Sequence, residues 1–494
     1  MAEIQQVKQS KSLVIIIAAT AAMGGLLFGF DTGVISGAIL FFQQDFKIDN
    51  SWIEIITTAG LAGAVIGAIS GGRVTDILGR KKVILASAFI FAIGAIWSGF
   101  APNPVNLIWA RLFIGLAIGI SSFSVPLYIA EISPTKIRGI LVSLFQLLIT
   151  IGIMVSYLSD LAFANESDLH SWRPMFIVGV IPALILLIGT LFLPETPRWL
   201  MSKGREEKSR KVLQLIENPS MVEEVLNKMK EEIALDKTKM NWSEVLKPWL
   251  RNALIIAVGI MFFQQFVGIN TVIYYSPKIF LIAGFQGARA ATWGAVSVGI
   301  INVIFTIISL FFIDKLGRRK LYFIGLSGIV ISLASLGTIF LMHDSLGPFG
   351  KWLAIIFVLV YIAFFAISLG PLGWLIISEI FPLKVRGLGS SIGSLSNWFF
   401  NGMVAFTFFK IVKALTFTGT NIITPEKVYD PGTNSFMEKM IDQGNPAGAF
   451  WVYAAVGVLG LIWGYYFIPE TKGITLEEIE EHWRKGTKPI DIKK

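Results

Sequence analysis

Long runs of apolar residues without charge fill most of this chain of 494 residues. A helix needs roughly 20 mainly apolar residues to cross the hydrocarbon layer of a membrane. Windows of about this length occur at about 12–40, 52–72, 83–100, 106–127, 139–163, 175–193, 253–275, 290–313, 321–342, 352–377, 388–409 and 448–468. The pattern predicts an all-α membrane protein with twelve transmembrane helices. Because only 15% of the residues are charged, a chain of ordinary soluble domains is excluded.

The positions of lysine and arginine predict how these helices are oriented. Short loops rich in positive charge stay on the cytoplasmic side of a membrane. Such loops follow even-numbered windows, with the basic residues Arg73, Arg80, Lys81, Lys82, Lys136, Arg138, Lys315, Arg318, Arg319, Lys320, Lys384 and Arg386. We therefore expect a multi-pass protein of the plasma membrane with both termini in the cytoplasm. The loop at about 411–446 is longer and also carries lysines, and long loops follow the rule weakly.

A polar segment separates the sixth window from the seventh. Residues 200–250 are rich in Lys and Glu, and their leucines and isoleucines recur at helical spacing. We expect short helices against the inner face of the membrane domain, with a solvated linker as the alternative. One helix is predicted to start at Ser220, which has the capping-box spacing to Glu223. The predicted units are an N-terminal six-helix half (1–199), a cytoplasmic helical linker (200–250), a C-terminal six-helix half (251–470) and a cytoplasmic tail (471–494).

Three charged motifs occur twice in the same order. The pairs are Gly72–Lys82 with Ile313–Lys320, Tyr128–Gly139 with Ile376–Gly387, and Pro194–Thr196 with Pro469–Thr471. Chance similarity between apolar segments would not repeat charged loop motifs in register. We infer that a six-helix unit was duplicated, which is typical of transporters.

Asp31 lies well inside the first apolar window. A carboxylate in the hydrocarbon layer is energetically expensive, so such a residue is a functional candidate by default. The alternative is a structural hydrogen-bond acceptor. Arg111, near the start of the fourth window, is the obvious partner for its charge.

Several further motifs identify a family. They are Gly72–Lys82, Arg111-x-x-x-Gly115-x-x-x-Gly119, Pro194-Glu-Thr-Pro-Arg198, Gln264-Gln265-x-x-Gly268-x-Asn270, Gly370-Pro371-x-x-Trp374 and Pro469-Glu-Thr-Lys-Gly473. With these motifs the sequence closely resembles the sugar porter family of the major facilitator superfamily over nearly its whole length. The resemblance implies a twelve-helix alternating-access carrier for a monosaccharide, with its site near the bilayer midplane between the halves. Composition and spacing alone indicate only a duplicated transporter.

The resemblance also gives Asp31 and Arg111 a role. In proton-coupled members of the family the matching Asp and Arg pair across these helices, whereas animal facilitators have Asn at the Asp position. Burial of a carboxyl group favours its protonated form and a nearby guanidinium favours its charged form, so helix movement that changes their distance switches proton affinity. The sequence therefore predicts proton symport.

The resemblance further implies which residues contact the sugar. A sugar ring presents hydroxyl groups and apolar C–H faces, so its site needs amides and an aromatic wall. The amides matching the family's positions are Gln146, Gln264, Gln265, Asn270, Asn302 and Asn397, and the aromatic residues are Trp374 and Trp398. Adjacent Gln264 and Gln265 cannot both face the same neighbour. Asn397 stands where a bacterial xylose symporter has Gln and animal glucose facilitators have Asn, which leaves hexose and pentose open.

Simpler explanations exist for these residue types. Amides also form hydrogen bonds between membrane helices, and tryptophans also mark the interfacial belt. Trp374 follows Gly370-Pro371, and a helix break of this kind is tolerated mainly where it lines a cavity.

Charged residues recur at the predicted cytoplasmic helix ends. They are Asp76, Arg80, Glu131, Arg138, Glu195 and Arg198 in the first half and Asp314, Arg318, Glu379, Arg386 and Glu470 in the second. We expect networks that hold the two halves together on the inside when the site faces outward. Simple topology signals would explain the positive charges but not the recurring acids.

Other functional classes lack their signatures. The chain has no cysteine, and His170, His343 and His482 have no metal-ligand spacing, so we expect neither a metal site nor a cofactor. Without a phosphate-binding Gly-x-x-x-x-Gly-Lys-Ser/Thr loop, an ATP-driven pump is excluded, and no constellation suggests an enzyme. A sugar uniporter and a non-transporting sugar sensor remain as alternatives. The expected partners are a monosaccharide, a proton and the lipid bilayer, with a functional monomer.

Overall fold

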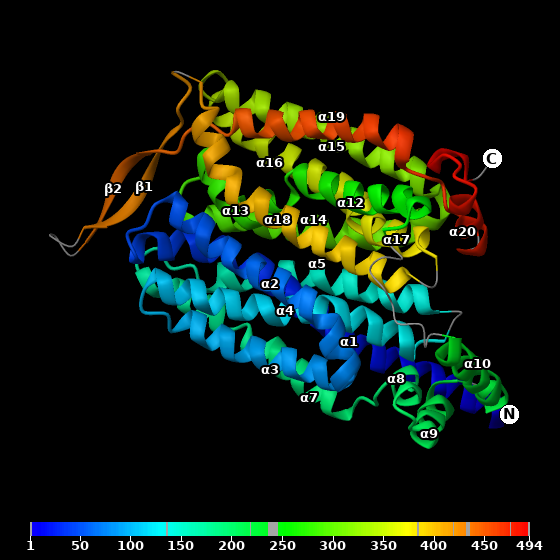
Figure 1. The fold of residues 1–494 in the computed structure, drawn as a ribbon. Coiled ribbons are helices and arrows are strands. Elements are labelled where there is room, and N and C mark those ends of the chain that lie inside the picture. Colours follow the sequence, from blue (N-terminus) through cyan, green and yellow to red (C-terminus); the bar gives the residue numbers. More distant parts are fainter. Residues whose placement is uncertain are drawn as a thin grey trace.

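The computed structural model describes residues 2–134, 137–217, 219–235, 246–382, 385–417, 419–430, 435–474 and 476–492. Long helices run side by side through most of the molecule (Figure 1). The first half contains α1 (Ala2–Asp45), α2 (Asn50–Leu78), α3 (Arg80–Gly99), α4 (Pro104–Ile132), α5 (Arg138–Phe163), α6 (Trp172–Ile177) and α7 (Val180–Phe192). The pair α6 and α7 forms the sixth span, within Leu169–Phe192.

The second half repeats this arrangement with more interruptions. Its helices are α12 (Arg251–Phe266), α13 (Ile269–Ile282), α14 (Ala288–Leu316), α15 (Arg318–Leu341), α16 (His343–Ile367), α17 (Leu369–Ile380), α18 (Arg386–Ala414) and α19 (Ala447–Phe467). Eleven spans within the described residues are long and apolar enough to cross a membrane, including the pairs α12–α13 and α16–α17. The predicted window 388–409 lies in α18, a further long helix rich in Gly, Ser and Asn. The predicted twelve-helix fold is therefore confirmed.

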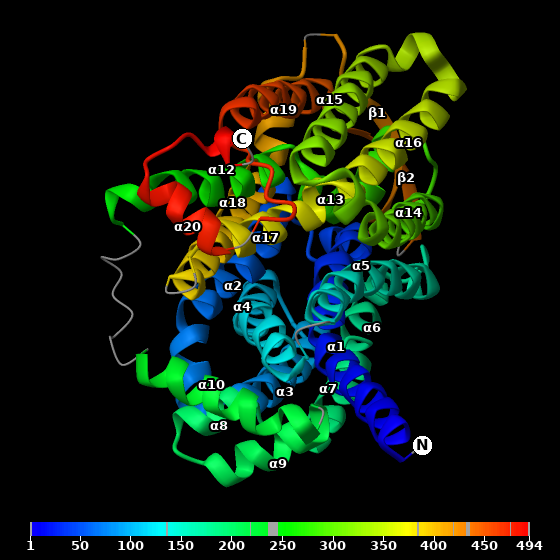
Figure 2. The same ribbon diagram turned by 90° about the vertical axis from the view of Figure 1, so that its right-hand side faces the viewer.

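The segment between the halves forms short helices at one end of the bundle. They are α8 (Pro197–Ser202), α9 (Glu206–Ile216) and α10 (Val222–Leu235), and α20 (Leu476–Arg484) lies at the same end. Figure 2 shows α8 to α10 beside the first half and α20 beside the second. Short helices were expected here, but α10 begins at Val222, after a 3-10 turn over Pro219–Met221, and not at Ser220. We call this the small-helix end, and both chain ends lie there (Figure 1).

The opposite end carries a feature that the sequence analysis missed. Strands β1 (Ile423–Asp430) and β2 (Ser435–Asp442) pair antiparallel and project from the bundle (Figure 1). Both strands lie within the long loop expected at 411–446, and α18 extends into the first residues of that loop. Two eight-residue runs on either side of Pro431-Gly432 are a hairpin signal in the sequence. We call this the hairpin end.

The duplicated motif at Gly79 and Gly317 has the same backbone in both halves. Gly79 (φ 96°, ψ 155°) precedes α3, and Gly317 (φ 85°, ψ 165°) precedes α15. Only glycine adopts such a conformation readily. A Cβ atom at either position would also collide with a carboxylate, that of Glu195 or of Glu470 respectively. The repeat found in the sequence is thus a structural repeat that includes its acidic partner.

Small residues allow the helices of the first half to pack closely. Gly115 and Gly119 on α4 lie against the backbone of Gly60 and Ala64 on α2, and no Cβ would fit at either glycine. Membrane helices commonly associate through such small residues. The motif that begins at Arg111 therefore brings α4 directly onto α2.

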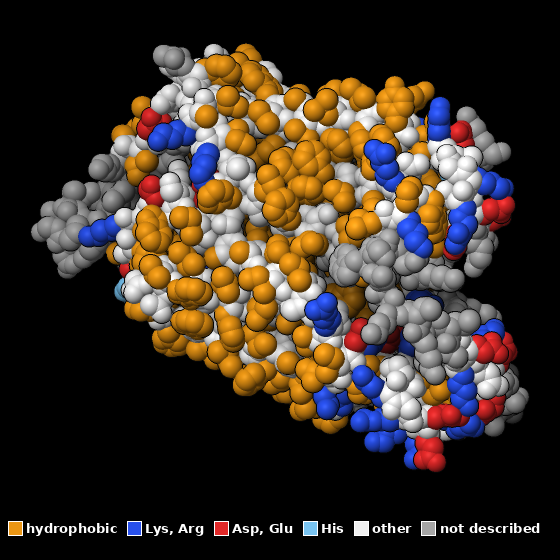
Figure 3. All heavy atoms as spheres, in the orientation of Figure 1, with side chains coloured by type: hydrophobic (Ala, Val, Ile, Leu, Met, Phe, Trp, Pro, Cys, Tyr) orange, Lys and Arg blue, Asp and Glu red, His pale blue; other side chains and the backbone are white. Residues whose placement is uncertain are grey.

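The surface agrees with a membrane location. Large apolar side chains cover the middle of the molecule, whereas charged side chains gather mainly at the small-helix end (Figure 3). Phe192 and Ile69, for example, are 82% and 64% exposed. Exposed apolar surface on this scale marks a protein whose surroundings are lipid.

Candidate functional site

Two spans of the second half are broken near their middle. The seventh span changes from α12 to α13 at Gly268, whose φ of 84° only glycine adopts readily. The tenth span changes from α16 to α17 at Ser368. Non-helical backbone at membrane depth is tolerated where protein or a cavity satisfies its polar groups.

Amide side chains satisfy these breaks and contact one another. The Gln264 amide nitrogen donates to the carbonyl oxygens of Leu369 (2.7 Å) and Gly370 (3.2 Å), at the start of α17. The Gln264 oxygen accepts from the amide nitrogens of Asn397 (2.8 Å) and Gln265 (3.3 Å). This network joins α12, α17 and α18.

The adjacent glutamines have different neighbours, as expected. The Gln265 oxygen accepts from the Asn270 amide nitrogen at 2.5 Å, which ties α12 to α13 across the break. All four amide side chains are buried. The structure thus joins Gln264, Gln265, Asn270 and Asn397 in one hydrogen-bonded chain, which we call the amide network.

The other predicted sugar residues lie outside this chain of hydrogen bonds. Trp374 is half-buried on α17, and its neighbour Gly373 lies so close to Gln264 that a Cβ atom would be 2.8 Å from the Gln264 amide nitrogen. Asn302 is buried on α14, and Gln146 is half-buried on α5. Neither has a hydrogen bond to the amide network within the described part of the chain.

Asp31 and Arg111 form a buried ion pair. Asp31 on α1 is 6% exposed, Arg111 on α4 is 3% exposed, and the Arg111 Nη1 atom donates to the Asp31 Oδ1 atom. Within the described residues the Arg111 Nε atom has no hydrogen-bond partner. Gly60 leaves room for the guanidinium, because a Cβ there would be 3.2 Å from Nη2. The predicted pairing is present.

A small cavity beside this pair is closed by residues of the other half. The cavity of about 10 Å³ is near the minimum that holds one water molecule. Its lining includes Asp31 and Arg111 from the first half and Tyr274 on α13 and Trp398 on α18 from the second. The surroundings of the ion pair therefore depend on how the two halves are docked.

Trp398 connects this cavity with the amide network. Its indole nitrogen donates to Ser122 Oγ at 3.4 Å, and the centroid of its ring lies 4.8 Å from the centroid of the Phe28 ring. Both partners belong to the first half, whereas the preceding residue on α18, Asn397, belongs to the amide network.

The charged residues at the small-helix end come together within the first half. Arg80 contacts Asp76 and Glu131, each at 3.1 Å. Glu195 accepts from the backbone amides of Arg80 (3.1 Å) and Lys81 (3.2 Å). Burial raises the pKa of Glu195 above its ordinary value, although these amides and the Arg80 charge act in the opposite direction.

The second half repeats the cluster. Arg318 contacts Glu379 at 2.8 Å, and Glu470 accepts from the backbone amides of Arg318 (3.0 Å) and Arg319 (3.3 Å). The contacts described here for both clusters join residues of the same half. The predicted contact between halves is not among these contacts and stays a prediction.

Four other gating candidates contribute few or no described contacts to these clusters. Arg138 donates to the Ser133 carbonyl oxygen at 3.5 Å, and Arg198 is exposed on α8. The side chains of Asp314 and Arg386 lie outside the described residues.

Contacts between the halves occur at the hairpin end, and the sequence analysis missed the residues that make them. Glu54 on α2 contacts Lys410 on α18 at 2.6 Å, and Lys278 on α13 donates to Gln43 (3.0 Å) and Asn50 (2.6 Å). The Tyr157 hydroxyl donates to the Ile273 carbonyl oxygen at 2.8 Å. The available signal was a charged residue inside an apolar window for Glu54 and a charged residue three positions after a window for Lys278.

Comparison with known proteins agrees with this architecture. Residues 17–483 match the sequence model of the family described as "Sugar (and other) transporter". The glucose transporter GlcP of Staphylococcus epidermidis is 37% identical over 97% of this chain and 99% of its own length. The galactose-proton symporter of Escherichia coli is 36% identical over 99% of this chain and 98% of its own length.

A solved structure gives the same result. The proton:xylose symporter XylE bound to 6-bromo-6-deoxy-D-glucose, a major facilitator superfamily protein, matches with a TM-score of 0.77 and 31% sequence identity. The match covers 96% of this chain and 100% of that chain. The expected resemblance to sugar porters and the expectation that the chain is not an enzyme are both confirmed. The chain belongs to the sugar (and other) transporter family and is a membrane sugar transporter with the major facilitator fold.

Proposed function

We propose that this transporter is a proton-coupled symporter for a monosaccharide, a hexose or a pentose, that works by alternating access. The observation that carries the proposal is the buried ion pair of Asp31 and Arg111, next to a cavity closed by Tyr274 and Trp398. A carboxylate buried inside a membrane span is expensive and marks function. The names of the E. coli galactose-proton symporter and of the proton:xylose symporter support the same chemistry.

Coupling follows from the position of the pair between the halves. While Arg111 holds Asp31, the carboxylate stays charged, and when the two separate, burial favours a protonated carboxyl group. Because Tyr274 and Trp398 come from the second half, movement of that half changes the surroundings of the pair. Proton binding at Asp31 then depends on conformation.

The amide network is proposed to bind the sugar. Gln264, Gln265, Asn270 and Asn397 supply donors and acceptors, which a sugar's hydroxyl groups also need. Gln146 and Asn302 are proposed to add contacts, and Trp374 and Trp398 to provide the aromatic wall. The hydrogen bonds within the network hold these amides close together in the protein interior.

The small-helix end is proposed to face the cytoplasm, with both termini there, in the cell membrane. The clusters around Arg80 and Arg318 are proposed to link the halves when the site opens outward, with Glu195, Glu470 and the other charged residues named above. Neutralising Glu379 would then shift the resting population inward and slow turnover. Unchanged transport kinetics would count against this latch. A functional monomer and the unit boundaries at 199, 250 and 470 are part of the same proposal.

The test is uptake by purified protein in vesicles. Labelled hexoses, pentoses and inositol are supplied with and without an imposed pH gradient. We expect one sugar class to accumulate against its concentration gradient only when the pH gradient is present. Asp31→Asn should abolish this accumulation. Gradient-independent equilibration would indicate a uniporter, and uptake of no sugar would indicate a sensor.

A further inference from the structure

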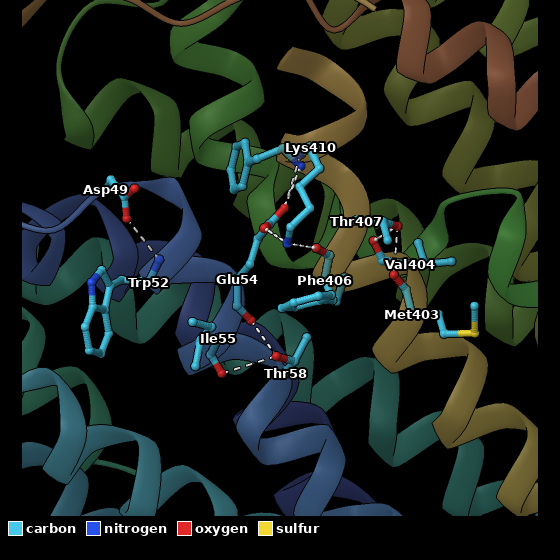
Figure 4. Close-up of polar contacts among 12 residues, drawn as sticks. Asp49, Trp52, Glu54, Ile55, Thr58, Met403, Val404, Phe406, Thr407 and Lys410 are labelled. Carbon is cyan, nitrogen blue, oxygen red and sulfur yellow. Dashed lines mark hydrogen bonds and ion pairs between the residues drawn. The ribbon is translucent and has the colours of Figure 1, made fainter. Parts of the chain in front are cut away.

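Glu54 connects α2 of the first half with α18 of the second. Its side chain is 1% exposed, although it belongs to neither the amide network nor the Asp31 pair. Its Oε1 atom accepts from the backbone amide of Phe409 at 2.9 Å and from that of Lys410 at 3.4 Å. Its Oε2 atom contacts Lys410 Nζ at 2.6 Å (Figure 4).

The backbone amides that donate to Glu54 lie in the interior of helix α18. In an α-helix the amides of residues 409 and 410 donate to the carbonyl oxygens of residues 405 and 406. Here those oxygens also accept from side chains: Ala405 from the Tyr275 hydroxyl at 3.1 Å and Phe406 from Lys410 Nζ at 2.8 Å. One turn of α18 therefore has a side-chain partner for each of its four polar groups.

Neighbouring contacts complete the closure between the halves. The ring centroids of Tyr275 and Phe409 lie 4.7 Å apart, and Lys278 Nζ lies 5.0 Å from the centroid of the Phe409 ring. Lys278 also binds Gln43 on α1 and Asn50 on α2. Glu54 is thus part of a junction between α1 and α2 on one side and α13 and α18 on the other.

We propose that Glu54 is a positioning residue for substrate exchange: it stabilises closure of the hairpin end by accepting the backbone amides of Phe409 and Lys410 on α18. When the halves separate, Glu54 leaves, and the amides of 409 and 410 have the carbonyl oxygens of 405 and 406 as their acceptors. Both states then satisfy the polar groups of α18, as a two-state gate requires.

The gate lies on the helix that carries part of the site. Asn397 and Trp398 precede the turn Ala405–Lys410 by about two helical turns on α18. A movement of this helix would therefore move the amide network and the wall of the Asp31 cavity together. The proposal holds for any transported sugar and does not depend on proton coupling.

An ordinary ion pair between Glu54 and Lys410 makes different predictions. For an ion pair alone, Glu54→Gln should be as harmful as Glu54→Met, and the exchange Glu54→Lys with Lys410→Glu should restore function. For a carboxylate that accepts backbone amides, Gln keeps one acceptor oxygen and Met keeps none. The exchange variant should then not restore function, because a lysine side chain accepts no hydrogen bond.

The experiment measures the population of the closed hairpin end. The chain has no native cysteine, so spin labels can be placed at exposed Ser51→Cys on α2 and Lys413→Cys on α18. Distances between the labels are recorded by pulsed electron paramagnetic resonance for each variant. We expect Glu54→Met and the exchange variant to lower the ratio of closed to open molecules about tenfold, which is about 1.4 kcal/mol. Glu54→Gln should lower it less.

A matched control separates gating from general damage. Asp160 on α5 is also fully buried and accepts a backbone amide, that of Gly37 at 3.1 Å, but within one half. Asp160→Asn should leave the distance distribution unchanged. A restored ratio in the exchange variant, or an unchanged ratio in Glu54→Met, would overturn the proposal. If Glu54→Met does not fold, the comparison of Glu54→Gln with the exchange variant decides in the same way.

Discussion

Replacing Gln264 with leucine tests whether the amide network forms the sugar site. The substitution removes all four hydrogen bonds of Gln264, of which the two shortest are those to Leu369 (2.7 Å) and from Asn397 (2.8 Å). A buried neutral hydrogen bond contributes about 1 kcal/mol net. The two bonds together therefore correspond to about 2 kcal/mol, or roughly 30-fold in an equilibrium constant. Because they orient the groups proposed to meet the sugar, we expect sugar affinity to fall by about this factor.

The assay is equilibrium binding of labelled sugar to purified protein, together with thermal unfolding. Asn445→Leu is a matched control, since the buried Asn445 amide nitrogen also donates to two carbonyl oxygens, those of Phe340 (3.0 Å) and Thr420 (2.9 Å). It lies at the hairpin end, so its loss should reduce stability without changing Kd. Equal Kd values for Gln264→Leu and the unmodified protein would refute the reasoning.

A double variant sharpens this result. Gln264→Leu and Asn397→Leu remove the same shared hydrogen bond, so their effects on Kd should not add. We expect the double variant to fall short of the sum by about 1 kcal/mol, the contribution of one such bond. Full additivity would show that the two amides act independently.

Three further predictions concern the charged and glycine positions. Burial raises the pKa of Glu195 in the folded protein above 4.5. The stability of the unmodified protein relative to Glu195→Gln should therefore fall as the pH rises from below 4.5 through the folded-state pKa. A difference in Tm between the two proteins that is the same at every pH would contradict this. Gly317→Ala should lower stability by about 1–3 kcal/mol in thermal unfolding, because of its positive φ and the Glu470 contact, whereas Gly139→Ala, with open space around it, should not. Arg111→Gln should destabilise by about 3–5 kcal/mol by leaving the Asp31 charge unpaired, and adding Asp31→Asn should recover much of the loss; no recovery would argue against the pair.

The fold was largely predictable because each span carries its own signal. Apolar windows gave the positions of the long helices, and the recurrence of the Gly79 motif at Gly317 marked the duplication through residue order alone. Asp31 stood out for a related reason, since a charge in an apolar window has few structural explanations. The break at Gly268 was also visible as a glycine within the seventh window.

The rest depends on contacts between distant parts of the chain. Glu54 and Lys410 are 356 residues apart, and each taken alone resembles a charge near the end of a span. The contact of Glu54 with the backbone of α18 has no local signal, because any residue of a helix has the same backbone amide. The clusters around Arg80 and Arg318 were predicted by residue but not by partner, since duplicated motifs cannot tell contacts within a half from contacts between halves.

We propose above that sugar and proton cross the membrane together and that Asp31 binds the proton. The most direct measurement is the pH change outside proteoliposomes when sugar is added without any imposed gradient. We predict that sugar entry alkalinises the medium with the unmodified protein, and that Asp31→Asn, although it still binds sugar, produces no pH change. Sugar entry without alkalinisation in the unmodified protein, or alkalinisation that persists in Asp31→Asn, would contradict the claim.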